Sequence, residues 1–132
     1  MIPNEKIQYW FDLADEDLSV AKILIDNNKL LYAAFMCHQV VEKALKGIIA
    51  RDCAEDEIPP KIHHLTKLAK RALLFEKLTE EQKSLLADIN PLNIEARYPE
   101  YKRMIADSLT LEKLRKLIAE TEELLCWIKT QL

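Results

Sequence analysis

Apolar residues recur at steps of three and four along most of the chain, and this spacing builds one face of a helix. Near the amino terminus it predicts a helix from Glu5 to Asn27 that is capped by Asn4 and ended by Asn27-Asn28, with its apolar face at Ile7, Phe11, Ala14, Leu18, Ala21 and Ile25. A second helix is predicted from about Leu30 to Arg51, with apolar positions at Ala34, Cys37, Val41, Leu45 and Ile48.

The remaining sequence predicts three more helices and no strand. The stretch from Ala54 to Lys61 is acidic and contains Pro59-Pro60, so it is expected to be a loop. A shorter helix follows from about His64 to Phe75, and a further one begins after Thr79, which stands at capping-box spacing from Gln82, and ends near Pro91. The segment from Pro91 to about Arg103 is expected to be irregular. The last helix starts near Thr110, with a stripe at Leu111, Leu114, Ile118, Thr121, Leu125 and Ile128.

Length and composition favour one all-α domain over residues 1–132. The chain has 132 residues, 49% of them hydrophobic, and Leu, Ala, Glu and Lys dominate. Its single glycine, Gly47, excludes the glycine-rich loops that hold phosphates in dinucleotide-binding and P-loop proteins. Long amphipathic helices must pack on one another. We therefore expect an up-and-down four-helix bundle with an additional short helix.

Charge and cysteine content restrict the environment of the protein. The formal net charge is −3, whereas a passive binder of duplex nucleic acid usually carries a basic excess. No apolar run reaches the ~18 residues that a membrane span needs, and the first residues lack the pattern of a secretory signal. The three cysteines form no CxxC pair, so neither a disulfide framework nor a metal site is predicted. We expect a cytoplasmic protein without membrane contact.

The second helix carries polar residues in unexpected places. His38 and Glu42 fall inside its apolar arc, and Lys46 lies just past the edge of that arc. A buried carboxylate is costly unless it is paired, so Glu42 needs a cation, for which Arg97 or a loop histidine is the natural candidate. Two interpretations stay open, a structural ion pair that fixes a loop on the bundle and a polar pocket at the edge of the bundle.

Two later segments carry further candidate residues. His63-His64 opens a helix in the most basic stretch of the chain, so it is either an anion site or a solvated face with a histidine near the cap. In Arg97-Tyr98-Pro99 the guanidinium can bind phosphate or carboxylate and the phenol ring can stack. This segment either holds a nucleotide or pins its loop to Glu42. No nucleophile–base pair stands out, so no catalytic residue is predicted, and Cys37 is expected to serve packing.

The run from Tyr32 to Lys46, YAAFMCHQVVEKALK, resembles the signature helix of HEPN domain proteins. Pro60, then His64-Leu65, and later Ala96-Arg97-Tyr98-Pro99 follow at the expected distances. The first helix also fits the family, so the resemblance covers most of the chain.

The resemblance implies a helical up-and-down bundle that is usually a homodimer. Such proteins are small and prokaryotic, and they are often encoded beside a minimal nucleotidyltransferase with which they act as a toxin–antitoxin-like pair. The resemblance also implies nucleotide binding, with no cofactor required. Carried over by matching position, the candidate nucleotide-binding residues are His38, Glu42, Lys43, Lys46, His64, Arg97 and Tyr98. The helix geometry reaches His38, Glu42 and Arg97 independently of the resemblance.

One departure from the family bears on activity. Many HEPN proteins are metal-independent ribonucleases with an Arg followed a few residues later by a His. Here Arg51 precedes His63 by twelve positions and no His follows Arg71, so that motif is absent. The sequence thus favours an accessory that binds a nucleotide and a nucleotidyltransferase, with Arg97, His64 and Lys46 converging in one pocket. The alternatives are an endoribonuclease toxin acting on RNA, for example through His64 and Arg97, and a purely structural helical interaction module.

Overall fold

A computed structural model describes residues 3–54, 57–94 and 98–132 of the chain. Within these ranges all regular secondary structure is helical and there is no strand, which confirms the all-α prediction. Its elements are α1 (Pro3–Asp26), α2 (Leu30–Ala50), α3 (Leu65–Arg71), the 3-10 turn η1 (Phe75–Lys77), α4 (Glu80–Ile89), the 3-10 turn η2 (Asn90–Leu92), α5 (Pro99–Ser108) and α6 (Leu111–Lys129).

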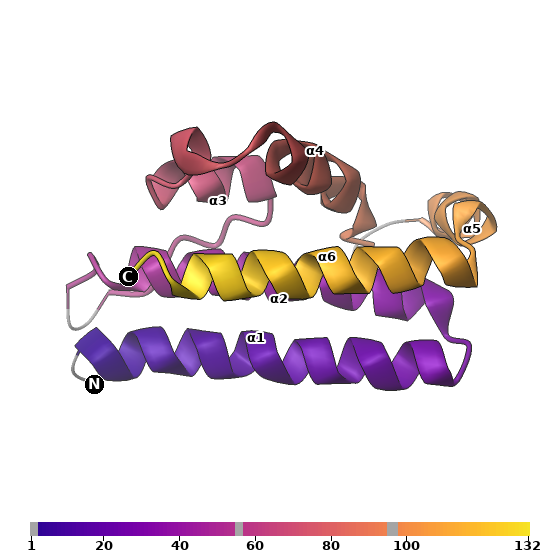
Figure 1. Cartoon of the computed structure of the whole chain (residues 1–132), viewed down its shortest axis with the longest axis horizontal. Coiled ribbons are helices and arrows are strands. Elements are labelled where there is room, and N and C mark those ends of the chain that lie inside the picture. Colours follow the sequence, from indigo (N-terminus) through magenta and orange to yellow (C-terminus); the bar gives the residue numbers. More distant parts are fainter. Residues whose placement is uncertain (1–2, 55–56, 95–97) are drawn as a thin grey trace.

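The helices form the predicted bundle around α2. Figure 1 shows α1, α2 and α6 side by side along the long axis, with α3 and α4 across one side of them and α5 at one end. Following the chain, α1 and α4 run one way along the bundle while α2 and α6 run the other way, which is up-and-down topology. None of the helices in the described part of the chain is long and apolar enough to cross a membrane.

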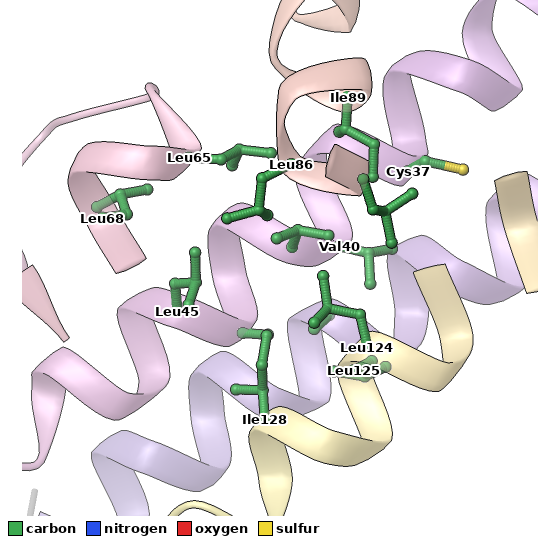
Figure 2. Packing of buried hydrophobic residues seen from close by; sticks show 14 of the residues in the cluster. Cys37, Val40, Leu45, Leu65, Leu68, Leu86, Ile89, Leu124, Leu125 and Ile128 are labelled. Carbon is green, nitrogen blue, oxygen red and sulfur yellow. The ribbon is translucent and has the colours of Figure 1, made fainter. Parts of the chain in front are cut away.

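The hydrophobic core is organised by α2, whose carboxy-terminal half is buried almost all round. Figure 2 shows how its side chains meet those of three other helices, with α3, α4 and α6 contributing to one continuous cluster. The labelled members are Cys37, Val40, Leu45, Leu65, Leu68, Leu86, Ile89, Leu124, Leu125 and Ile128. A helix that is covered on most sides can bury polar residues too, and α2 does so at His38, Glu42 and Lys46.

The single glycine of the chain lies at a close contact between α1 and α2. A Cβ atom at Gly47 would stand 2.8 Å from Cε1 of Phe11 and 3.3 Å from Cβ of Trp10. Phe11 is itself buried in the core, so its ring has little room to move away. Gly47 therefore permits the contact that places Trp10 against α2, beside Lys46.

Several helix ends agree with the sequence prediction. Thr79 and Gln82 form the expected capping box at the start of α4, and Thr110 caps α6. Asn28 takes a left-handed conformation with φ of 59°, and the amide of Lys29 then bonds back to Leu24 at 2.8 Å, which ends α1 as expected.

Three boundaries differ from the prediction. The helix α1 already begins at Pro3, so Asn4 lies inside it and is not its cap. The helix α3 ends at Arg71, because Leu73 turns left-handed (φ 62°) and a Schellman pair of hydrogen bonds closes the helix. The segment from Pro91 to Arg103 is not irregular throughout, since α5 starts at Pro99. A proline is well suited to the first turn of a helix, where its missing N–H has no partner to lose.

Candidate functional site

The carboxylate of Glu42 is the centre of a buried polar cluster. Glu42 is 5% exposed, and its Oε2 atom lies 3.1 Å from Nζ of Lys46, one helical turn further along α2. Its Oε1 atom lies 3.0 Å from Nδ1 of His63, in the loop that precedes α3. The hydrogen-bond partners of Glu42 therefore include a loop histidine, which is one of the two candidates expected from the sequence.

His38 fastens the same loop from the other side. Its Nε2 atom lies 3.0 Å from the carbonyl oxygen of His63, and because a carbonyl only accepts, Nε2 carries the proton. Its Nδ1 atom lies 3.3 Å from the side-chain amide nitrogen of Gln39, which donates to it. Burial lowers the pKa of His38 below the ordinary 6.5, although the Glu42 carboxylate and the His63 carbonyl pull it upward. His38 is thus a neutral ring that positions His63.

The ring of His63 is oriented by Glu42 and still reaches solvent. Because a carboxylate only accepts, Nδ1 of His63 donates the hydrogen bond. The other ring nitrogen, Nε2, forms no hydrogen bond within the described residues, and the side chain is 60% exposed. A buried carboxylate thus holds an exposed imidazole in one orientation, with Nε2 available to a ligand or a proton.

The ammonium group of Lys46 is buried and already has interaction partners inside the cluster. Lys46 is 6% exposed, and its ammonium group lies 5.9 Å from the centre of the Trp10 ring in addition to its contact with Glu42. Such a position over an aromatic face stabilises a cation. Lys46 therefore neutralises Glu42 from within the bundle.

The remaining candidate residues lie elsewhere. Lys43 forms an ion pair with Asp17 of α1, and no ion pair or hydrogen bond among the described residues joins it to Glu42. Tyr98 precedes α5 and is 81% exposed. Arg97, on which much of the sequence argument rests, falls outside the described residues.

His64 caps the start of α3, a position for which an anion site was one of two interpretations. Its Nδ1 atom accepts from the backbone amide of Lys67 at 3.3 Å and so caps α3. The backbone amide of Leu65 is taken by Oδ1 of Asn90 at 2.8 Å. The interpretation of a histidine near the helix cap is therefore correct. Among the described residues no hydrogen bond or ion pair joins His64 to Lys46.

A loop histidine was an expected partner of Glu42, but the sequence did not distinguish His63 from His64, and the resemblance pointed to His64. The helix boundary is a signal against His64 alone, because an N-cap side chain bonds to its own helix, and it does not indicate what His63 contacts.

Cys37 is a packing residue, as expected. It is fully buried, and burial raises the pKa of its thiol to about 11, so it stays protonated near neutral pH. Among the described residues no group of three or more His, Cys, Asp or Glu side chains is arranged to hold a metal ion.

The fold and the cluster define a class of protein, a helical bundle whose central helix carries a buried His and Glu four residues apart. A family model described as HEPN domain matches residues 7–131, nearly the whole chain. The chain belongs to the HEPN domain family. The comparison with curated proteins and the comparison with solved structures each found no match.

Replacing Glu42 by Ala should cost about 3–5 kcal/mol of unfolding free energy, because it leaves the buried ammonium of Lys46 without its carboxylate. Chemical denaturation measures this loss. The matched control is Asp15→Ala, which breaks the Asp15–Lys129 pair on the surface and should cost no more than about 1 kcal/mol. Equal losses in the two variants would contradict a buried, coupled role for Glu42.

Stability should also fall as the pH drops below 6.5. The unfolded chain protonates His38 near 6.5, whereas burial lowers the pKa of His38 in the folded state, so the unfolded state binds more protons in this window. The contribution is fully present above 6.5 and is lost toward the lower folded-state pKa. Denaturation curves on both sides of pH 6.5 measure it. His38→Gln keeps a donor for the His63 carbonyl and cannot titrate, so an unchanged pH dependence in this variant would exclude His38 as its source.

Proposed function

We propose that this HEPN-domain protein binds a nucleotide through its phosphates at the exposed edge around His63, and that it acts as the accessory of a minimal nucleotidyltransferase in a toxin–antitoxin-like pair. The observation that carries the proposal is the Glu42–His63 contact. Burying a carboxylate costs desolvation energy, and here that cost fixes the orientation of an exposed ring. A fixed ring orientation matters more for binding a ligand than for holding a loop.

The surroundings of His63 favour an anionic ligand. Lys61 and Lys67 lie within four residues of His63 in the sequence, are exposed and form no ion pair among the described residues. Arg71 of α3 lines a hollow together with Asp52 and Glu57. Phosphate oxygens accept from lysine, arginine and imidazole N–H groups alike. In this proposal His63 contacts the phosphate, while His38, Glu42 and Lys46 position it from behind.

The nucleotidyltransferase part of the proposal rests on family membership. The chain matches the HEPN model over residues 7–131, and the resemblance implies a partner of this class. A nucleotide held at His63 would lie on the surface, where an enzyme that transfers nucleotidyl groups can reach it.

A thermal-shift panel of ATP, GTP, NAD and nucleoside mono- and diphosphates tests the binding. A ligand at about 100 times its Kd adds about 2.7 kcal/mol, which should raise the melting midpoint of a chain of this size by several degrees. We expect a shift that His63→Ala abolishes and that Arg97→Ala weakens. His64→Asn should keep the shift, because asparagine also caps a helix well. Arg103→Ala, an exposed cation on α5, is the control and should respond like the wild type.

A flat panel in the wild-type protein would contradict nucleotide binding and leave the Glu42 cluster as a structural ion pair. A shift that survives His63→Ala would contradict the placement of the site. The partner part is tested separately, by co-purification with a nucleotidyltransferase encoded next to this chain.

One observation favours the endoribonuclease alternative as a second candidate. With Nδ1 of His63 donating to Glu42, Nε2 is oriented to take the proton of a ribose 2′-hydroxyl as a general base. This candidate predicts RNA cleavage in the presence of a metal chelator, abolished by His63→Ala and at least ~100-fold slower in Glu42→Gln. Gel electrophoresis of RNA after prolonged incubation with the protein tests this candidate, and intact RNA would exclude the endoribonuclease.

A further inference from the structure

Leu73, directly after α3, combines a strained backbone conformation with an exposed side chain. Its φ of 62° lies in the left-handed region, where a bulky side chain costs free energy and glycine does not. The turn itself is needed, because the amides of Leu73 and Leu74 both bond back to carbonyl groups of α3 and Leu74 is buried. The Leu73 side chain, however, is 74% exposed and gains little from burial. Glycine would suit this turn better within the isolated chain, so the leucine side chain indicates a contact with another molecule.

A hollow lies beside Leu73. It measures about 300 Å³ and is lined by Lys70, Leu73, Phe75 and Glu76. Phe75, in the turn η1, packs against the hydrophobic core and is only half-buried. Phe75 and Leu73 therefore give the hollow apolar walls, and an apolar side chain that enters it loses its contact with water, which is favourable.

Two ammonium groups from different helices lie over the Phe75 ring. Nζ of Lys70, near the end of α3, lies 5.0 Å from the centre of the ring, and Nζ of Lys83, on α4, lies 4.9 Å from the same centre. Lys70 forms no ion pair within the described part of the chain, and Lys83 has one with the exposed Glu80 at 3.6 Å. Glu76, at the hollow, pairs with neither lysine among the described residues. Because like charges at one ring repel each other, an anion that contacts both is stabilising.

We propose that these residues bind an acidic segment of a partner protein. We name the surface of Lys70, Leu73, Phe75 and Lys83 the Phe75 corner. One apolar side chain of the segment fills the hollow against Leu73 and Phe75, and flanking carboxylates contact the ammonium groups of Lys70 and Lys83. The charge of the surrounding chain supports this partner, because residues 61–77 contain five Lys or Arg and one Glu whereas the whole chain has a formal net charge of −3.

The shape of the Phe75 corner favours a protein segment over a lipid surface or RNA. A lipid surface takes up apolar side chains that project together, whereas Leu73 is the one largely exposed apolar side chain of the corner and Phe75 borders a hollow. RNA would need a free aromatic face for a stacked base, and two ammonium groups lie over the Phe75 ring. A hollow with cations beside it fits an apolar side chain that projects between carboxylates.

The Phe75 corner is separate from the Glu42 cluster. It lies at the turn between α3 and α4, which Figure 1 shows on the side of the bundle away from α1. His63 precedes α3, and no hydrogen bond or ion pair among the described residues joins its side chain to the corner. Binding at the corner therefore does not depend on nucleotide binding at His63.

A library of random peptides displayed on phage, selected against the immobilised protein, tests the proposal. We expect the enriched peptides to share an apolar residue flanked by Asp and Glu. Fluorescence anisotropy then measures the Kd of an enriched, fluorescein-labelled peptide for each variant of the protein. Leu73→Gly should weaken binding at least ~10-fold, because it removes an apolar side chain that the complex buries. The double variant Lys70→Glu, Lys83→Glu should also weaken it, because its carboxylates repel those of the peptide.

Two exposed residues outside the corner supply matched controls. Ile23→Ala shortens an apolar side chain that is 59% exposed on α1, and Lys116→Glu reverses a charge on α6. Both variants should bind the peptide like the wild type. Leu73→Gly should keep the helical circular dichroism of the wild type, because glycine adopts the left-handed conformation without cost. If it does not fold, the double lysine variant supplies the answer.

A selection that enriches no peptide, or enriches peptides without acidic residues, would overturn the proposal. So would peptides that bind Leu73→Gly as tightly as the wild type. Binding to phosphatidylserine vesicles or to single-stranded RNA that is lost in Leu73→Gly, with no peptide enriched, would overturn it in favour of those ligands. Loss of peptide binding in Leu73→Gly with an unchanged response to nucleotides would support the proposal and separate it from the proposed function.

Discussion

The burial of one carboxylate, that of Glu42, organises the loop side of this molecule. A carboxylate with 5% exposure inside a helical bundle is tolerable only if cations and donors surround it. Lys46 supplies one cation from the same helix, and His63 supplies a donor from the loop. The need to neutralise Glu42 therefore fixes where the chain must pass after it leaves α2.

His38 and Lys6 explain why this loop can hold its position. His38 donates to the backbone carbonyl of His63, so this hydrogen bond holds the loop independently of the orientation of the His63 ring. At the other end of the loop the Lys6 ammonium on α1 donates to the carbonyl of Ala54, with the carbonyl of Glu57 at 3.5 Å. Backbone groups are thus held at both ends of the loop, while the His63 side chain remains exposed to solvent.

The helix α2 divides the molecule by function as well as by packing. One side meets α3, α4 and α6 in the core, and the edge toward the loop holds the Glu42 cluster. The side beside α1 carries the ion pair between Asp17 and Lys43. One helix thereby links the hydrophobic core and the candidate binding edge, and the absence of a side chain at Gly47 lets α1 lie close to that helix.

Periodicity by itself determined α1, α2, α3, α4 and α6, their core faces and the anomaly at His38 and Glu42, because these features depend on residues within a few turns of one another. Pro99 is also a local signal for the start of α5, because proline is favoured in the first turn of a helix. The same proline favours an extended conformation at the residue before it, so the local signal was ambiguous. Only the tertiary structure decided that His63, and not His64, meets Glu42. That choice depends on the path of a loop that spans the end of α2 and the start of α3. No local pattern encodes that path, because the energy that selects it comes from burying charges brought together from distant positions.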